Sequence, residues 1–239
     1  DEWVSDTVVY SLDIDSNGVI WACVDDGTAI LVSDCSVIGS FESEGLLDSP
    51  LYCVGSSNDG TIYLGTSGSS IYRMELADDK YTESSYHLTK LDTGDVSTFN
   101  AIAEDNNGNL WAAALNGVGY FDRDFDWHKV SAEHATAAGN IAFDYEGNVW
   151  IASGSYGIIH LVDGQFCNAN TAAGLEETSL NSVEVYDGFY YLGTDTGIII
   201  LDADFNQIHN ELTGLLSGDR VRNITADSDG NIWIGTYYN

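Results

Sequence analysis

The sequence predicts an all-β fold, because one short motif that is typical of two strands joined by a turn recurs along its 239 residues. Four copies carry Asp, then Gly three residues later and Trp six residues later, and they span residues 15–21, 105–111, 144–150 and 227–233. Two degenerate copies, residues 58–63 and 186–191, end in Tyr. The turn glycines stand at positions 18, 60, 108, 147, 188 and 230, a period of about 40 residues. Short strands repeated at this period predict a β-propeller with one repeat per blade.

Each repeat predicts a blade of four antiparallel strands. The first strand carries one apolar residue per repeat, and these residues are Leu12, Val54, Ile102, Ile141, Val183 and Ile224. Small or polar residues precede them, namely Ser11, Cys53, Ala101, Asn140, Ser182 and Asn223. After the glycine turn, the Trp or Tyr of the second strand should fill the space between neighbouring blades. A small residue follows the ring two positions later, as Cys23, Gly65, Ala113, Ala152, Gly193 or Gly235. A third strand and a polar outer strand complete the blade, joined by turns such as Asp163-Gly164.

The repeats predict a single propeller domain or propeller fragment over residues 1–239, with about six repeats of which the last is incomplete. Five repeats are full, and the sixth holds its two inner strands. Because a propeller hides its terminal edges by closure, we expect an incomplete ring or one closed by the N-terminal segment. A parent protein with seven blades would supply the remainder, and any signal peptide or membrane helix would lie outside this segment.

The charge of the chain excludes two classes of partner. There are 38 acidic residues against 7 basic residues, for a net charge of -31. Such a surface repels phosphate backbones and anionic lipids, so we expect no nucleic acid partner. No apolar run approaches the ~20 residues that span a bilayer, so this segment should not insert into a membrane. We interpret the acidic excess as the soluble surface of a secreted domain.

The four cysteines, at positions 23, 35, 53 and 167, lack the spacing of a metal site. Cys23 and Cys53 fall at positions where the other repeats also carry small or polar residues, so they are interpreted as small buried side chains. A disulfide among the four remains open, because pairing cannot be deduced from sequence.

The sixth repeat closely resembles the two-component-regulator propeller repeat, in Asp-x-x-Gly-Asn-Ile-Trp-Ile-Gly-Thr at residues 227–236 and in the preceding Ser217-Gly-Asp-Arg-Val-Arg-Asn-Ile224. The resemblance extends over essentially the whole chain and is best in the first, third, fourth and sixth repeats. Repeats two and five replace Trp with Tyr63 and Tyr191, and we expect both to shorten the turn. The resemblance implies the extracytoplasmic sensor region, in the periplasm or at the cell surface, of a bacterial hybrid two-component system or related receptor.

That family senses breakdown products of polysaccharides and passes the signal through a membrane helix. The resemblance therefore implies a non-enzymatic propeller that binds an oligosaccharide or another small molecule, in a larger membrane-anchored or secreted parent that could be a homodimer. The family's usual sandwich module, its membrane helix and its kinase or cyclase are not part of this sequence, so the sensing role rests on analogy. Streptogramin-lyase-type propellers carry similar turns, which keeps an enzyme as one alternative. A protein-interaction scaffold without a small ligand is the other.

One segment matches the first half of a calcium loop. Asp13, Asp15, Asn17 and Gly18 have the required spacing, but the twelfth position holds Val24 where such a loop needs a bidentate Glu. Because the motif recurs as a turn in the other repeats, we interpret it as a hairpin turn rather than a metal site. The carboxylates of residues 122–126 are likewise interpreted as a solvated turn. The sequence predicts no metal and no other cofactor.

The five histidines provide no catalytic assignment. None of them has metal-site spacing, and His160 lies in an apolar strand as a satisfied packing residue. His87, His128 and His134 lie near connections between blades and could reach a face of the propeller. A lyase would need one of them as a base next to a second group, and nothing in the sequence places such a group. We therefore predict no catalytic residue.

A ligand should meet the loops between second and third strands and the loops between blades, where exposed aromatic and polar groups suit stacking on sugars. The candidate ligand-binding residues are Tyr156, Asp195, Thr196, Arg220 and Tyr237. Arg220 stands out because basic residues are scarce, and it could pair with an acidic sugar. The alternative is a local ion pair with Asp219 or another acid.

Overall fold

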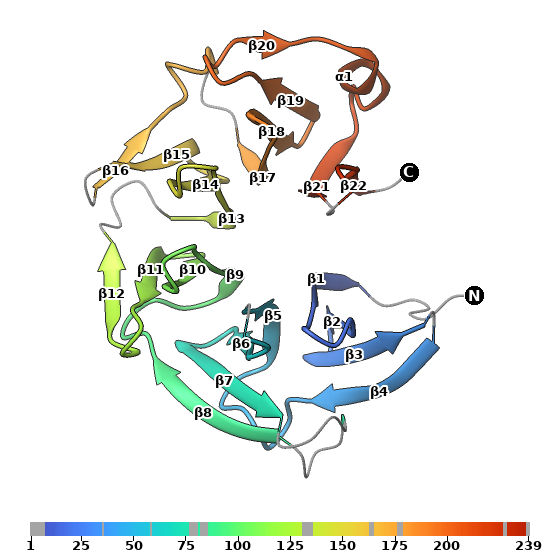
Figure 1. The fold of residues 1–239 in the computed structure, drawn as a ribbon, viewed down its shortest axis with the longest axis vertical. Helices are drawn as coiled ribbons and strands as arrows, with labels where there is room; N and C mark the ends of the chain where they lie inside the picture. Colours follow the sequence, from blue (N-terminus) through green and yellow to red (C-terminus); the bar gives the residue numbers. More distant parts are fainter. Residues whose placement is uncertain are drawn as a thin grey trace. The chain divides into compact units, whose positions relative to one another are not determined.

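The structure is a computed structural model that describes residues 8–34, 36–57, 59–76, 81, 86–130, 136–162, 165–175, 179–226 and 229–237. The described residues form five four-stranded sheets and one two-stranded sheet, and neighbouring strands follow one another along the chain (Figure 1). All the pairings are antiparallel. This confirms the predicted propeller of four-stranded blades in which the last repeat holds its two inner strands. Six residues from the segments named above, Cys35, Asn58, His134, Asp163, Gly164 and Asp227, lie outside the described residues.

The chain divides into two compact units, one formed by residues 1–114 and 119–129 and the other by residues 115–118 and 130–239. The first unit contains three blades. Blade 1 consists of β1 (Val9–Ile14), β2 (Ile20–Val24), β3 (Thr28–Ser33) and β4 (Ser36–Glu42). Blade 2 consists of β5 (Leu51–Ser56), β6 (Ile62–Thr66), β7 (Ser70–Leu76) and β8 (Tyr86–Asp92). Blade 3 consists of β9 (Phe99–Glu104), β10 (Leu110–Ala114), β11 (Gly117–Phe121) and β12 (Trp127–Val130), and the first two residues of β11 group with the second unit.

The second unit contains the remaining blades and a short helix. Blade 4 consists of β13 (Ala138–Phe143), β14 (Val149–Ser153), β15 (Gly157–Val162) and β16 (Gln165–Asn168). Blade 5 consists of β17 (Leu180–Tyr186), β18 (Phe189–Thr194), β19 (Gly197–Leu201) and β20 (Gln207–Ile208). Blade 6 consists of β21 (Arg220–Ala226) and β22 (Ile232–Tyr237).

The connection from β20 to β21 contains the helix α1 (Glu211–Leu215), which the sequence analysis did not predict. Asn210 accepts the backbone N–H of Thr213, and the Thr213 hydroxyl accepts the backbone N–H of Asn210. This reciprocal capping box was the available sequence signal for the helix. In the part of the chain that the structure describes, no helix combines the length and the hydropathy of a membrane-spanning segment.

The rings of Trp21 and Trp150 pack between blades, as predicted. Trp21 and Trp150 are almost fully buried. The Trp21 ring lies 6.3 Å from the ring of Tyr86 in blade 2, and the Trp150 ring lies 4.8 Å from that of Tyr190 in blade 5. Trp233 of blade 6 is 63% exposed, and no later blade follows it among the described residues. The next blade therefore contributes to the burial of the Trp21 and Trp150 rings.

The columns of small residues are also needed for packing. A Cβ added at Gly65 would lie 2.5 Å from Cys53 Sγ and 2.9 Å from Phe99 Cβ. Cys23 and Cys53 are buried, as the sequence predicted. Their thiols are free, and burial raises the pKa of both. Cys167 is an exposed free thiol.

The inner turns contain a repeated hydrogen-bond unit that the sequence analysis did not identify. The Asp that opens each of three turns accepts two backbone N–H groups through Oδ1 and the indole N–H of the following Trp through Oδ2. The Asp–Trp distances are 3.1 Å for Asp15–Trp21, 2.9 Å for Asp105–Trp111 and 2.9 Å for Asp144–Trp150. A buried indole N–H needs such an acceptor, which explains why Asp precedes Trp by six residues. The hairpin-turn interpretation of the calcium-like segment is therefore confirmed.

The prediction that repeats two and five both shorten this turn was wrong for repeat two. In repeat two the last pair before the turn is Ser56 with Ile62, which leaves five residues in the turn. In repeat one the last pair is Ile14 with Ile20, which also leaves five. Ser57 takes the place of the Asp and hydrogen-bonds to Asp59 at 2.5 Å. Only repeat five is shorter, because Tyr186 pairs directly with Phe189.

The carboxylates of residues 122–126 lie in the outer turn of blade 3, as the sequence analysis predicted. Asp122 Oδ1 accepts the backbone N–H groups of Asp124 and Asp126, both at 3.0 Å. Asp202 holds the corresponding turn of blade 5 in the same way, through Asp204 and Asn206. These carboxylates are therefore turn-forming groups.

Candidate ligand-binding surface

A β-bulge recurs at the start of the first strand of every blade. In blade 1, Val9 pairs with Val24 but Ser11 pairs with Cys23, so Tyr10 is an extra residue opposite β2. The same shift occurs in the other five blades, and the extra residues are Tyr10, Tyr52, Asn100, Gly139, Asn181 and Arg222. Bulges re-aim side chains and are frequent next to functional sites. Each of these bulges lies beside the end of the second strand, where the predicted ligand-binding loop begins.

The sequence analysis missed these six residues because they share no side-chain type. The available signal was their position, one residue before the column of small residues in the first strand.

Asn181 connects the first strands of blades 4, 5 and 6. Its side-chain Nδ2 donates to Val221 O and to Asp195 Oδ1, both at 3.0 Å. Its backbone oxygen lies against Gly139, where an added Cβ would approach to 2.9 Å. Gly139 is therefore needed for the close approach of blades 4 and 5, and Asn181 is fixed in position on both sides.

Asp195 and Arg220 form an ion pair next to Asn181. Arg220 Nε lies 2.7 Å from Asp195 Oδ1, and both side chains are about half exposed. This confirms the alternative of a local ion pair, and the acid is Asp195. The hydrogen bond from Asn181 lowers the pKa of Asp195 below its ordinary value, and the positive charges of Arg220 and Arg222 lower it further.

Tyr237 and Thr196 lie next to the Asp195–Arg220 ion pair. Tyr237 pairs with Arg220 across β21 and β22, and the guanidinium carbon lies 6.0 Å from the centre of the Tyr237 ring, which is 48% exposed. The carbonyl of Thr196 accepts the backbone N–H of Gly218 at 2.9 Å, which ties the loop after β18 to the start of β21. The structure thus brings four of the five predicted residues together.

Tyr156 lies in the corresponding loop of blade 4. Its backbone N–H donates to Ser153 Oγ at 3.1 Å, and its carbonyl accepts the side chains of Asn168 and Asn170 at 2.6 and 2.9 Å. Its backbone is therefore held by its own blade and the connection that follows it. The role of Tyr156 in ligand binding stays a prediction.

We name this cluster the Arg220 surface, defined by Asn181, Asp195, Thr196, Arg220, Arg222 and Tyr237. It offers an amide, a carboxylate, a hydroxyl, two guanidinium groups and an aromatic ring, the groups that recognise polar ligands through hydrogen bonds and stacking. Within the described ranges, no His, Cys, Asp and Glu side chains gather as a metal-binding group of three.

The first unit presents a different set of bulge residues. The rings of Tyr10 and Tyr52 stack with their centres 4.7 Å apart and their planes inclined by 23°. Tyr10 is 44% exposed. The bulges of blades 1 and 2 therefore place an aromatic pair at the start of their first strands.

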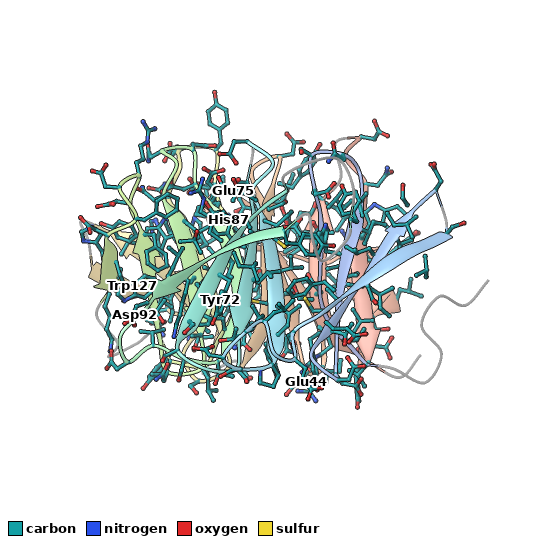
Figure 2. The ribbon with its side chains drawn as sticks, turned by 90° about the horizontal axis from the view of Figure 1, so that it is seen from below. Glu44, Tyr72, Glu75, His87, Asp92 and Trp127 are labelled. Atoms are coloured by element: carbon teal, nitrogen blue, oxygen red, sulfur yellow. The ribbon has the colours of Figure 1, made fainter. Side chains whose placement is uncertain are left out.

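Three described histidines, His87, His128 and His160, lie away from the Arg220 surface in the chain and have other contacts. His87 pairs with Glu75 across the outer strands β7 and β8 (Figure 2). His128 Nε2 lies 2.7 Å from Asp122 Oδ2 at the outer turn of blade 3. His160 stacks on Trp150 with ring centres 4.0 Å apart, which confirms its packing role.

His160 is not a fully satisfied residue, and this corrects the prediction. Its Nε2 atom is buried without a hydrogen-bond partner. Burial lowers the pKa of the imidazole, so the neutral form is favoured.

Comparisons with known proteins agree with this architecture. The family model for the two component regulator propeller matches residues 215–238, a range that contains β21 and β22. A search of curated proteins found no significant match.

Similar solved structures include virginiamycin B lyase from Staphylococcus aureus, with a TM-score of 0.72, 14% identity, and coverage of 96% of this chain and 78% of the lyase. Two others are named as extracellular domains of hybrid two component systems from B. thetaiotaomicron, BT3049 and BT4673. Their TM-scores are 0.57 and 0.58 and their identities 16% and 18%, and 98% of this chain is covered in both comparisons. This chain spans 38% of the length of each of these two. At sequence identities of 14% to 18%, the similarity to these structures shows the fold alone. The match of the family model identifies residues 215–238 as a two component regulator propeller repeat. The chain therefore carries the two component regulator propeller repeat on a β-propeller fold.

Proposed function

We propose that the chain is the ligand-binding propeller of a bacterial sensor receptor, outside the cytoplasm, and that it binds an oligosaccharide without changing it chemically. The family match supports the two-component setting, and two similar structures are named as extracellular domains of such systems. Since the chain spans 38% of those proteins, the membrane-anchored parent and its dimerisation belong to the proposal.

The Arg220 surface is the single observation that carries the binding role. A sugar ring presents an apolar face, which stacks on an exposed aromatic ring such as Tyr237, and hydroxyl groups, which bond to carboxylates and amides such as those of Asp195 and Asn181. Asn181, Asp195 and Arg220 are already linked to one another at 2.7 to 3.0 Å. A site fixed in advance loses less conformational entropy when a ligand binds.

A thermal-shift screen of the 239-residue chain against neutral and charged oligosaccharides tests the proposal. A ligand at 100 times its Kd should stabilise the fold by about 2.7 kcal/mol, which gives a measurable rise in Tm. The variant Tyr237→Ala should lower the affinity at least tenfold, because it removes the stacking ring.

Tyr145→Ala is the matched control, because Tyr145 is fully exposed in the inner turn of blade 4, at the opposite end of the strand from the bulge. It should leave binding unchanged. Absence of a shift with every oligosaccharide, on a folded chain, would contradict the proposal and favour a protein-interaction scaffold.

A lyase-like enzyme is the second candidate, since the propeller with the TM-score of 0.72 is a lyase. Mass spectrometry of the ligand after incubation distinguishes the two functions. We expect the oligosaccharide to keep its original mass. Fragments of lower mass would show cleavage and favour the enzyme.

A further inference from the structure

We infer that the ligand of the Arg220 surface is an oligosaccharide that carries carboxylate or sulfate groups, and that Arg222 is the residue that selects for this negative charge. The inference rests on the proposed function and specifies the ligand class for the same surface. It depends on three features of Arg222: its lack of partners, its place at a bulge and its proximity to a second arginine.

The first feature is the lack of a partner. In the part of the chain that the structure describes, Arg222 is exposed and its guanidinium makes no ion pair and no hydrogen bond. The chain has 38 acidic residues for 7 basic ones, so an arginine that is not paired with a carboxylate is unusual.

The other basic side chains in the described residues are all engaged. Four of them pair with carboxylates at 2.7 to 2.9 Å, and the pairs are Arg73–Glu75, Lys90–Asp48, Lys129–Asp95 and Arg220–Asp195. Arg123 donates from Nε to the carbonyl of Asn107 at 2.6 Å. Among the basic residues that the structure describes, Arg222 is thus the one without a bonded partner.

The second feature is the position of Arg222 at the bulge of blade 6. The five other bulge residues are uncharged, namely Tyr10, Tyr52, Asn100, Gly139 and Asn181. The bulge therefore forms without an arginine, and its geometry does not explain why Arg222 is charged. Bulges re-aim side chains. The bulge of blade 6 follows Val221, whose carbonyl accepts the Asn181 side chain that also donates to Asp195.

The third feature is the arrangement of charges. Arg220 and Arg222 stand two residues apart on β21, and both lower the pKa of Asp195 by their positive charge. Asp195 is bonded to Arg220 and Asn181, and no carboxylate of the described residues forms an ion pair with Arg222. Asp219 precedes Arg220 in the connection from α1, and its backbone N–H bonds to Leu216 O at 3.1 Å.

The chemistry of the guanidinium fits an oxyanion. Its planar array of N–H donors matches two oxygens of a carboxylate or a sulfate, and charge-assisted hydrogen bonds of this kind are stronger than neutral ones. Free anions are repelled by a chain with a net charge of -31. An anionic oligosaccharide would bind because its sugar rings add stacking and hydroxyl contacts to the arginine contact.

The test is a calorimetric titration of the 239-residue chain with three oligosaccharides of equal length, one neutral, one containing uronic acids and one sulfated. At least one anionic ligand should bind ten times or more tightly than the neutral one, and added salt should weaken it. The variant Arg222→Gln should reduce the anionic affinity about tenfold and leave the neutral affinity unchanged. Arg222→Lys should restore part of the loss, because it keeps the charge but not the planar donor array.

Arg123→Gln is the control, since it removes an exposed arginine of blade 3 and should not alter binding. Equal affinity for neutral and anionic ligands, or no effect of Arg222→Gln, would overturn the inference while leaving oligosaccharide binding intact. Failure of all three ligands to bind a folded chain would remove the proposed function as well. Because Arg222 is exposed, the Tm of its variants should match that of the original protein, which separates a binding effect from unfolding.

Discussion

The indole N–H of Trp111 donates to Asp105 Oδ2 over 2.9 Å, across a five-residue turn at one end of blade 3. Both residues are buried, and Asp105 also accepts the backbone N–H groups of Asn107 and Asn109. One carboxylate thus fixes both the turn and the orientation of the buried Trp111 ring. The same unit occurs in blades 1 and 4.

We predict that Asp105→Ala lowers the free energy of unfolding by about 2–4 kcal/mol, because it leaves the buried indole N–H and two turn N–H groups without an acceptor. Urea unfolding followed by Trp fluorescence measures the change. Asp124→Ala removes an exposed carboxylate from the outer turn of the same blade and should change stability by less than about 0.5 kcal/mol. A similar effect of both variants would argue against the structural role of Asp105.

The two residues should also be energetically coupled. A double-mutant cycle of Asp105→Ala and Trp111→Phe should give a coupling energy of about 1–2 kcal/mol, because Phe keeps an aromatic ring but has no N–H donor. Additive effects of the two substitutions would mean that the hydrogen bond contributes little.

Gly65 should resist substitution because of packing alone. The added methyl group of Gly65→Ala would contact Cys53 Sγ and Phe99 Cβ at 2.5 and 2.9 Å, so we predict a loss of about 1–3 kcal/mol. Gly214 of α1 has no atom within 4 Å of the added methyl group, and Gly214→Ala should stabilise the protein by up to about 1 kcal/mol. Calorimetric Tm values of the two variants should therefore move in opposite directions, and a tolerated Gly65→Ala would show that the blades are less tightly packed than described.

Glu184 makes stability depend on pH. Burial raises its pKa from the ordinary value of 4.5 to about 7, so the folded protein holds a proton that the unfolded chain releases. The contribution is present in full below pH 4.5 and is lost as the pH rises through about 7. Glu184→Gln should abolish this dependence and stabilise the protein at pH 8 by about 2–3 kcal/mol relative to the original chain. Unfolding curves of the two proteins should agree near pH 4, and parallel curves at every pH would contradict the assignment.

The carboxylate of Asp195 reports on the state of the Arg220 surface. The Asn181 hydrogen bond and the charges of Arg220 and Arg222 lower its pKa, so Asn181→Ala should raise that pKa towards the ordinary value of 3.8. An NMR titration of the Asp195 carboxyl carbon measures the shift, with Asp124 as the reference. An unchanged pKa in Asn181→Ala would show that the amide does not hold the carboxylate.

The repeat made the blades predictable, because turn glycines, apolar columns and rings follow from local chemistry that recurs along the chain. The role of the Asp in holding Trp was visible as a spacing of six, yet it was read as a turn signal only. Helix α1 was missed because it occurs once and outside the repeat, so only its capping residues indicated it.

The candidate site was predictable in part for the same reason. Loop position identified Asp195, Thr196, Arg220 and Tyr237, which the structure brings together. The bulges that add Asn181 and Arg222 depend on strand register, which was not inferred from the spacing of the repeats. The ion pair of Arg220 was foreseen as an alternative, but its partner Asp195 lies 25 positions earlier and is reached only through the fold of the blades.

The most direct test of the central claim is a calorimetric titration of the best oligosaccharide from the screen into the original chain and into Asn181→Ala. The account predicts saturable binding to the original chain and an affinity about tenfold lower for the variant, because Asn181 holds Asp195 and the start of β21 in place. Equal affinity for the two proteins would contradict the account, since the oligosaccharide would then bind away from the Arg220 surface.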